Sequence, residues 1–189
     1  EMPRRKTEFL PGQYYHLYNR GNNREKIFFE RENYLFFLRR FWHYLAQDSL
    51  DISAYCLMPN HYHFLVRLRK SDFSQKMQAF TLSYTKAINK RYRRCGSIFQ
   101  GRFQAILVDS DAYVLQLSRY IHLNPVKAGL VRYPKDWEFS SYLEYVGLRQ
   151  GRLPKVGDVL EQVGSVEAYR NFVEGGMVIE PELQRLMLD

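Results

Sequence analysis

Cysteine is scarce in this sequence, and long apolar runs are missing from it. The 189 residues include only Cys56 and Cys95, which are too few for a disulfide framework and too far apart for a CxxC metal site. No apolar stretch reaches the roughly 20 residues that cross a bilayer, and the basic first residues lack the apolar core of a signal peptide. We therefore expect a protein of a reducing, cytoplasmic compartment that has no membrane partner.

Acidic residues are scarce in the first part of the chain. Residues 1–135 carry 23 Lys and Arg against 10 Asp and Glu, a net charge of +13, whereas residues 136–189 carry 5 against 10, a net charge of −5. A basic body favours a polyanionic partner such as nucleic acid. The acidic end indicates a different role for the last segment.

Hydrophobic periodicity predicts alternating strands and helices. Alternating apolar positions mark strands, and three- or four-residue steps mark helices. Breaks fall at the turn-forming pair Pro59-Asn60, at Gly101, which is expected to bend a strand, and at Pro125 and Gly129, which are expected to halt a helix, while Ser71 is a candidate helix cap. We expect strands at 13–21, 52–58, 61–68 and 97–108, and helices at 31–50, 71–94 and 109–124.

The element order β-α-β-β-α-β-α predicts an α+β protein. Two amphipathic helices on one face of a four-stranded antiparallel sheet form a ferredoxin-like sandwich, and the last helix follows it. Beyond residue 136 the helical pattern is short and interrupted, which predicts a small helical C-terminal appendage. We place the main domain at residues 1–150 and the acidic appendage at 151–189.

Two histidines stand two residues apart at the start of an expected strand. Side chains alternate across a strand, so His61 and His63 share a face with Cα atoms roughly 6.5 Å apart. Two imidazoles at this spacing can converge on one divalent cation. The alternative is a half-exposed strand pair that binds nothing.

A tyrosine and an asparagine lie four residues apart on the last predicted helix of the main domain. An α-helix turns about 100° per residue, so Tyr120 and Asn124 lie nearly on one face. The phenol and the amide oxygen can therefore face one site. Alternatively, Tyr120 is a core aromatic and Asn124 a turn residue before proline. His122 points to the opposite side and is not expected to be a ligand.

Four segments together resemble the REP-associated tyrosine transposases. CLMPNHYHFLV (56–66) is similar to the HUH motif, histidine-hydrophobic-histidine, of HUH endonucleases, and SRYIHLNPVKAGLV (118–131) is similar to the tyrosine-helix segment. YHLYNRGNNREKIF (15–28) and GSIFQGRFQ (96–104) resemble the first strand with its loop and the fourth-strand region. The resemblance covers about residues 10–150 in the family's order, and 151–189 match only loosely.

The resemblance implies a role for each of these residues. Tyr120 would be the nucleophile, His61 and His63 would bind a divalent metal, Mg²⁺ or Mn²⁺, and Asn124 would be the third ligand. Single-tyrosine relatives often have glutamine in this last position, and asparagine carries the same carbonyl oxygen on a shorter arm. The metal would neutralise the scissile phosphate. The general base stays open between water and a nearby lysine.

The same resemblance implies an activity on DNA. Attack by Tyr120 on a single-stranded phosphodiester would give a 5′-phosphotyrosine and a free 3′-hydroxyl, and a later 3′-hydroxyl could displace the tyrosine and reseal the strand. The expected partner is hairpin-forming DNA with a single-stranded guide sequence, at the nucleoid of a prokaryotic cell. The protein would act as a monomer or a homodimer.

Three basic groups are candidates for phosphate contacts. The largest lies at the end of the second predicted helix and contains no acid in sequence, although a helix C-terminus favours cations even without a ligand. We predict phosphate binding by all three groups, which comprise Arg4, Arg5 and Lys6, then Arg20, Arg24 and Lys26, and then Lys86, Lys90, Arg91, Arg93 and Arg94.

Two other functions stay open. One is a hairpin-binding protein that does not cut DNA. The other is a metal-dependent phosphoesterase that uses water as the nucleophile and keeps Tyr120 for structure.

Overall fold

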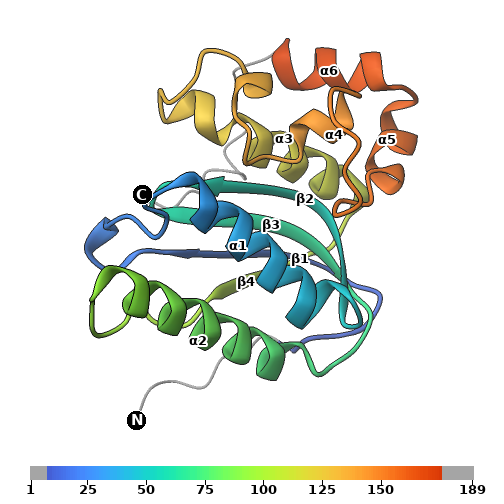
Figure 1. Ribbon diagram of the computed structural model, residues 1–189. Helices are drawn as coiled ribbons and strands as arrows, with labels where there is room; N and C mark the ends of the chain where they lie inside the picture. The colour runs from blue at the N-terminus through green and yellow to red at the C-terminus, as the bar shows by residue number, and fades with distance from the viewer. Residues whose placement is uncertain (1–7, 176–189) are drawn as a thin grey trace.

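A four-stranded antiparallel sheet with the strand order β2-β3-β1-β4 forms the centre of the protein (Figure 1). The computed structural model describes residues 8–175. Its strands are β1 (Tyr14–Arg20), β2 (Leu50–Met58), β3 (His61–Leu68) and β4 (Gln104–Val108). The α+β fold and its element order are as the sequence predicts.

The first two long helices cover one face of the sheet. They are α1 (Arg31–Phe41) and α2 (Phe73–Tyr92), and Figure 1 shows them together on the same side. Phe37 of α1 and Phe80 of α2 are fully buried and lie with their ring centroids 4.8 Å apart. Phe41 stacks on Phe64 of β3 at 4.1 Å. An aromatic core of this kind fixes the sheet against the helices.

The later helices gather on the opposite face, over β2 and β3 (Figure 1). Val114, Leu117 and Ile121 share a buried cluster with Ala54 of β2 and Leu65 of β3. This face therefore has its own core, in which α3 is the inner layer. The helices are α3 (Asp111–Lys127), α4 (Tyr142–Tyr145), α5 (Gly157–Val163) and α6 (Val166–Glu174).

Several element boundaries differ from the sequence expectation. The first helix changes to a π-helical turn at Trp42–Ala46 and is over before Leu50, where β2 begins. The predicted strand 97–108 is regular only from Gln104, because the preceding residues leave the sheet after the single bridge from Phe99 to Gly21. The predicted Ser71 cap is wrong, since α2 has Asp72 at its N-cap and no side-chain cap bond.

The helix α3 runs through Pro125 rather than stopping there. It ends at Lys127, where Gly129 adopts a φ of 68° and the backbone N–H of Leu130 donates to the carbonyl of Pro125. A glycine in the left-handed conformation after the last turn lets the backbone N–H groups that follow donate to the free carbonyls of that turn, and so ends the helix. The extra turn keeps Lys127 helical, two turns after Tyr120.

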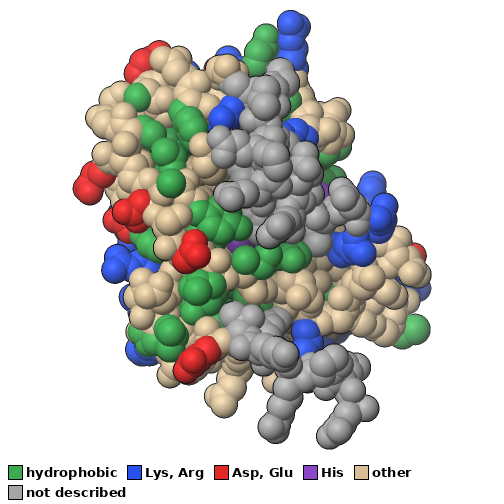
Figure 2. All heavy atoms as spheres, turned by 180° about the vertical axis from the view of Figure 1, so that it is seen from behind, with side chains coloured by type: hydrophobic (Ala, Val, Ile, Leu, Met, Phe, Trp, Pro, Cys, Tyr) green, Lys and Arg blue, Asp and Glu red, His purple; other side chains and the backbone are tan. Residues whose placement is uncertain are grey.

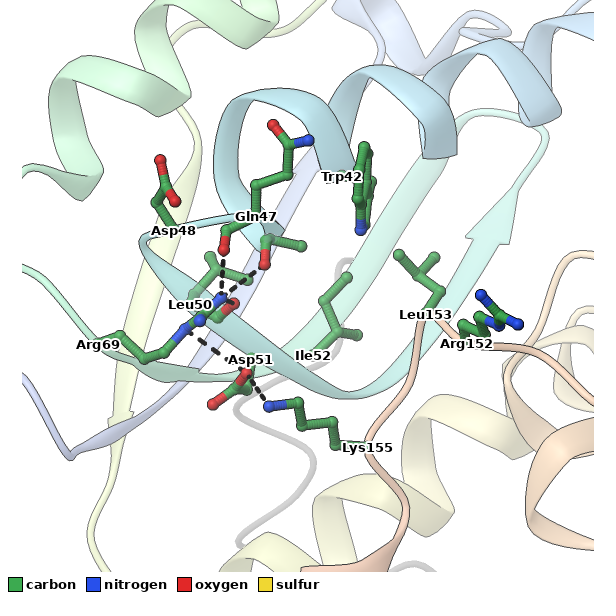
Figure 3. Close-up of a pocket in the computed structure, with 11 residues that line it drawn as sticks. Trp42, Gln47, Asp48, Leu50, Asp51, Ile52, Arg69, Arg152, Leu153 and Lys155 are labelled. Carbon is green, nitrogen blue, oxygen red and sulfur yellow. Dashed lines mark hydrogen bonds and ion pairs between the residues drawn. The ribbon is translucent and has the colours of Figure 1, made fainter.

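The C-terminal segment is attached to the free edge of β2. Figure 3 shows Lys155 directed at Asp51, and the two side chains form an ion pair of 2.7 Å. The backbone N–H of Lys155 also donates to the carbonyl of Ile52. A surface hollow of about 500 Å³ lies beside this contact, between Trp42 and Leu153. No helix in the described part of the chain is long and apolar enough to span a bilayer.

Candidate active site

The two histidines of β3 lie where the strand leaves its turn. Backbone hydrogen bonds hold this turn in place, because the carbonyl of Pro59 accepts from Ile27 and Phe28 and that of Asn60 accepts from Gly21. Strand alternation then turns His61 and His63 to the face that α3 covers, with ring centroids 5.1 Å apart. The turn thus fixes both imidazoles at one end of the sheet.

The helix α3 brings the asparagine and the tyrosine to the same place. The Oδ1 atom of Asn124 lies 3.4 Å from Nε2 of His61. The amide is oriented by its Nδ2 atom, which donates to the backbone carbonyl of Tyr120 at 3.2 Å. The ring of Tyr120 lies edge-on to His63, with centroids 5.5 Å apart. Four residues from distant parts of the sequence therefore meet in one site.

Burial keeps both imidazoles neutral. Burial is the main cause that lowers the pKa of His61, the hydrogen bond with Asn124 raises it, and the charge of Arg20 lowers it. The pKa of His63 is lowered well below its ordinary value by complete burial and by the neighbouring histidines His16 and His61. Neutral imidazoles offer a nitrogen lone pair, which is the form that binds a metal.

The site contains a donor set that fits a divalent cation. The Nε2 atom of His63 is fully buried and has no hydrogen-bond partner among the described residues. In the described part of the chain, no group of three His, Cys, Asp or Glu side chains could hold a metal ion. An amide oxygen such as that of Asn124 is therefore needed to complete the set with His61 and His63. Two imidazoles and one amide oxygen leave further coordination positions open.

A lysine that the sequence patterns did not single out lies beside the tyrosine. The Nζ atom of Lys127 lies 5.3 Å from the ring centroid of Tyr120. Burial, and then the charge of Arg119, lowers the pKa of Lys127 to about 8. The spacing of seven residues from Tyr120 on one helix was the signal that could have revealed it.

A third histidine, also not singled out by the sequence patterns, lies behind the pair. His16 on β1 is fully buried, and its Nε2 atom lies 2.9 Å from Nδ1 of His63. In a ferredoxin-like sheet the first strand lies beside the third, and alternation puts Tyr14, His16 and Tyr18 on one face. The order of the strands was therefore the signal that could have found His16.

His122 faces away from the site, as the sequence predicts. Its Nδ1 and Nε2 atoms lie 2.8 Å from the hydroxyl of Tyr169 and 2.8 Å from that of Ser141. Complete burial lowers its pKa to about 3. This neutral histidine connects α3 to the C-terminal helices instead of binding a metal.

The predicted DNA-binding residues are placed unequally. Arg20 ends β1 beside the site, where its Nε donates to Gln100 at 2.6 Å, and Arg24 and Lys26 are exposed in the loop that follows. Figure 2 shows Lys and Arg side chains grouped beside a histidine at one edge of the rear face. Arg4, Arg5 and Lys6 lie outside the described residues.

The five cations at the end of α2 divide into two sets. Arg91 donates to Glu30 at 2.7 Å, and Arg94 pairs with Glu25 at 3.1 Å. Among the described residues, no acid forms an ion pair with Lys86, Lys90 or Arg93, all of which are exposed. These three residues therefore carry the charge that is available to a ligand. The sequence does not show this division, because the two paired glutamates lie outside the cluster.

Comparison with known proteins assigns the chain to a family. Residues 10–124, which include all four residues of the candidate site, match the model of the family described as transposase IS200 like. The chain belongs to this family. The matched region covers well over half of the 189 residues.

Two curated relatives are described as REP-associated tyrosine transposases, the family that the sequence motifs resemble. A candidate REP-associated tyrosine transposase of Haemophilus influenzae is 32% identical over 101 residues, which cover 47% of this chain and 57% of the relative. The REP-associated tyrosine transposase of Escherichia coli is 29% identical over 115 residues, which cover 59% of this chain and 66% of the relative. The chain thus matches less than two thirds of the length of each.

A solved structure shares the fold of this transposase-family chain. It is that of a REP-associated tyrosine transposase bound to a REP hairpin, with a TM-score of 0.66 and 20% sequence identity. The match covers 82% of this chain and 98% of that one. The likeness therefore extends beyond the sheet and its first two helices, into the later helical part of the chain.

Proposed function

We propose that this IS200-like transposase is a metal-dependent single-strand DNA endonuclease and strand transferase that uses Tyr120 as its nucleophile. The observation that carries the proposal is the convergence of His61, His63 and Asn124 with Tyr120 in one buried site. A phosphoesterase with a water nucleophile has no need of a phenol beside its ligand set. The family membership supports the same reading.

The reaction follows from the groups that are present. His61, His63 and Asn124 would hold a Mg²⁺ or Mn²⁺ ion, which supplies charge neutralisation and orientation at the scissile phosphate. The oxygen of Tyr120 loses its proton and forms a bond to phosphorus, while the bond from phosphorus to the 3′-oxygen breaks. The 3′-oxygen takes up a proton and leaves as a 3′-hydroxyl. The DNA stays attached as a 5′-phosphotyrosine, so a second 3′-hydroxyl can reverse the step.

The charge of Lys127 favours the reactive form of the nucleophile. A phenol has an ordinary pKa near 10 and must become a phenolate to attack. A cation held over the ring of Tyr120 stabilises negative charge on its oxygen, both in the attack and when the tyrosine later leaves. Lys127 thus helps the reaction in both directions.

The substrate that fits this surface is hairpin-forming DNA with an unpaired flank. A structural neighbour binds a REP hairpin. The exposed cations Lys86, Lys90 and Arg93 lie in the last turns and at the C-cap of α2, at the site's end of the sheet but on the face opposite to α3. Phosphates of a DNA stem would pair with these cations. Attack on an unpaired strand is favoured, because Tyr120 is only 4% exposed and a strand without its complement can approach it more closely than a duplex.

One assay tests the proposal. The protein is incubated with a 5′-labelled and a 3′-labelled hairpin oligonucleotide, with Mn²⁺ or with EDTA, and analysed under denaturing conditions. We expect a covalent adduct with the 3′-side fragment that needs the metal and is absent in Tyr120→Phe. Tyr120→Phe should bind the hairpin as tightly as the wild type, since only one oxygen is removed.

The other outcomes identify the alternative functions. Binding without any cleavage would indicate a hairpin-binding protein. Cleavage without an adduct, or full cleavage by Tyr120→Phe, would indicate a phosphoesterase with a water nucleophile and would refute the role of Tyr120.

A further inference from the structure

His16 and His63 form a buried pair in which one particular nitrogen of each ring faces the other ring. His16 lies on β1 and His63 on β3, diagonal to one another on the same face of the sheet. Both side chains are fully buried, and the contact joins Nε2 of His16 to Nδ1 of His63 at 2.9 Å. Tyr18 packs against both rings, at 4.8 Å and 6.1 Å between centroids. The pair is therefore held in one arrangement.

Only one proton arrangement of this pair leaves a lone pair facing the site. Each neutral imidazole carries a single N–H. If Nδ1 of His63 donates to Nε2 of His16, then Nε2 of His63 carries the lone pair and Nδ1 of His16 carries a proton. If His16 donates instead, Nε2 of His63 must carry the proton and cannot bind a cation. The hydrogen bond therefore decides whether His63 can act as a ligand.

The structure also shows what this arrangement costs. Nδ1 of His16 is buried and makes no hydrogen bond with the described residues. Leaving a polar atom buried in this way costs about 1–3 kcal/mol. The ring of His16 is fully buried, and no carboxylate of the described residues pairs with it, which favours its neutral form. An apolar side chain would fill the same space more favourably if packing were its only role.

We propose that His16 is a positioning residue for the metal site: its Nε2 accepts the Nδ1–H of His63 and so keeps the lone pair of His63 Nε2 directed at the site. The inference rests on the proposed function in that His63 is taken as a ligand. Groups behind a metal-binding imidazole commonly select its tautomer and fix its orientation. Here a neutral histidine takes the place of the carboxylate or carbonyl that usually does so.

Two variants with the same amide group but different side-chain lengths test whether His16 positions His63. The Oε1 atom of glutamine lies three bonds from Cβ, as Nε2 of histidine does, so His16→Gln can still accept from His63. The Oδ1 atom of asparagine lies one bond short, so His16→Asn cannot. Mn²⁺ binding is measured by isothermal titration calorimetry without DNA, and thermal unfolding confirms that both variants fold. His122→Gln is the control, because this histidine is equally buried but faces the C-terminal helices.

We expect His16→Asn to bind Mn²⁺ about 10- to 100-fold more weakly than the wild type. His16→Gln should stay within a few-fold of the wild type, and His122→Gln should be unchanged. Equal affinities for His16→Asn and the wild type, or an equal loss in both His16 variants, would overturn the proposal. So would a wild type that does not bind Mn²⁺.

The same measurements separate this inference from the proposed function. If the Mn²⁺ affinities follow the expected order but no covalent DNA adduct forms, the role of His16 stands and the nuclease activity fails. If an adduct forms and both His16 variants keep full affinity, the nuclease stands and the role of His16 fails.

Discussion

Tyr120, Asn124 and Lys127 lie on one face of α3, and each of the three side chains makes a different contact in the site. Asn124 contacts His61, Tyr120 lies against His63, and Lys127 lies over the tyrosine ring. The helix repeat puts residues four and seven positions apart on one face. The ring of Tyr120 thus lies close to a neutral imidazole and to a lysine cation at the same time.

The charge of Lys127 leads to a prediction for the rate of adduct formation. Lys127→Gln should slow the appearance of the covalent adduct by about tenfold or more, since a loss of roughly 1.4 kcal/mol of charge stabilisation already has this effect. Lys127→Arg should keep most of the rate, because it keeps the cation. The measurement is a single-turnover rate with saturating hairpin DNA.

The pH profile provides the control. The wild-type lysine has a pKa of about 8 and loses its charge as the pH rises through that value, whereas arginine stays charged. Adduct formation by the wild type should therefore stop increasing with pH near 8, while Lys127→Arg continues to increase. A Lys127→Gln variant with the wild-type rate would contradict the role.

The sequence predicted the residues of the site better than their surroundings. Alternation and helix repeat, which act within one element, paired His61 with His63 and Tyr120 with Asn124, and the family resemblance assigned their roles. The contact between His16 and His63 depends on which strands are neighbours and on the diagonal offset of their register. These quantities are properties of the folded sheet, so local patterns in the chain did not show them.

At the scale of elements, the end of α2 is the feature with the clearest consequence for DNA binding. Its five cations look equivalent in sequence, but Glu30 and Glu25, from outside the helix, pair with Arg91 and Arg94. A cation that is already paired with a carboxylate has less to offer a phosphate. The unpaired set, Lys86, Lys90 and Arg93, should therefore contribute most to binding.

This division gives a prediction for the salt dependence of binding. The triple variant Lys86→Gln, Lys90→Gln, Arg93→Gln should lower the slope of log K against log salt by about 0.7–0.9 for each lost phosphate contact. The matched double variant Arg91→Gln, Arg94→Gln should change it by less per residue. Equal changes per residue in the two variants would show that the ion pairs do not matter, and an unchanged slope in both would place the DNA elsewhere.

Local signals predicted the existence of the elements but not all of their ends. The periodicity of residues 31–50 continues past Phe41, yet the chain changes to a π-helical turn so that it can enter β2 at Leu50. Pro125 does not stop α3, which continues to Lys127 and ends before the left-handed Gly129. Periodicity alone does not give either of these ends.

At the scale of the whole molecule, α3 connects two halves. One side of this helix faces the sheet and the candidate site, and the other packs on α5 and α6 through Val159 and Tyr169. His122 lies in the middle of the second contact, between Tyr169 and Ser141. The C-terminal helices therefore support the helix that carries Tyr120, which their acidic composition alone did not reveal.

The buried His122 makes stability depend on pH. Its folded-state pKa is about 3, against 6.5 for an ordinary histidine, so the unfolded chain takes up a proton below about pH 6.5 and the folded protein does not. Stability is therefore lost as the pH falls below that value, by up to about 1.4 kcal/mol for each pH unit and each such group.

Urea unfolding at pH 7.0 and pH 5.0 tests this dependence. His122→Gln should be less stable than the wild type at pH 7, because hydrogen bonds in the contact are changed. Its further loss between pH 7 and pH 5 should be smaller than that of the wild type by about 1–2 kcal/mol. The same loss in both proteins would mean that His122 takes up a proton without unfolding.

Tyr120 is only 4% exposed, and under the proposed function this burial has a consequence for the DNA-linked intermediate. A phosphate ester formed on a shielded oxygen would meet few solvent molecules, so its spontaneous hydrolysis would be slow. The bond energy of the cut strand would then be preserved until an incoming 3′ end entered the same space. Burial of the tyrosine would in this way favour rejoining of the strand over its degradation.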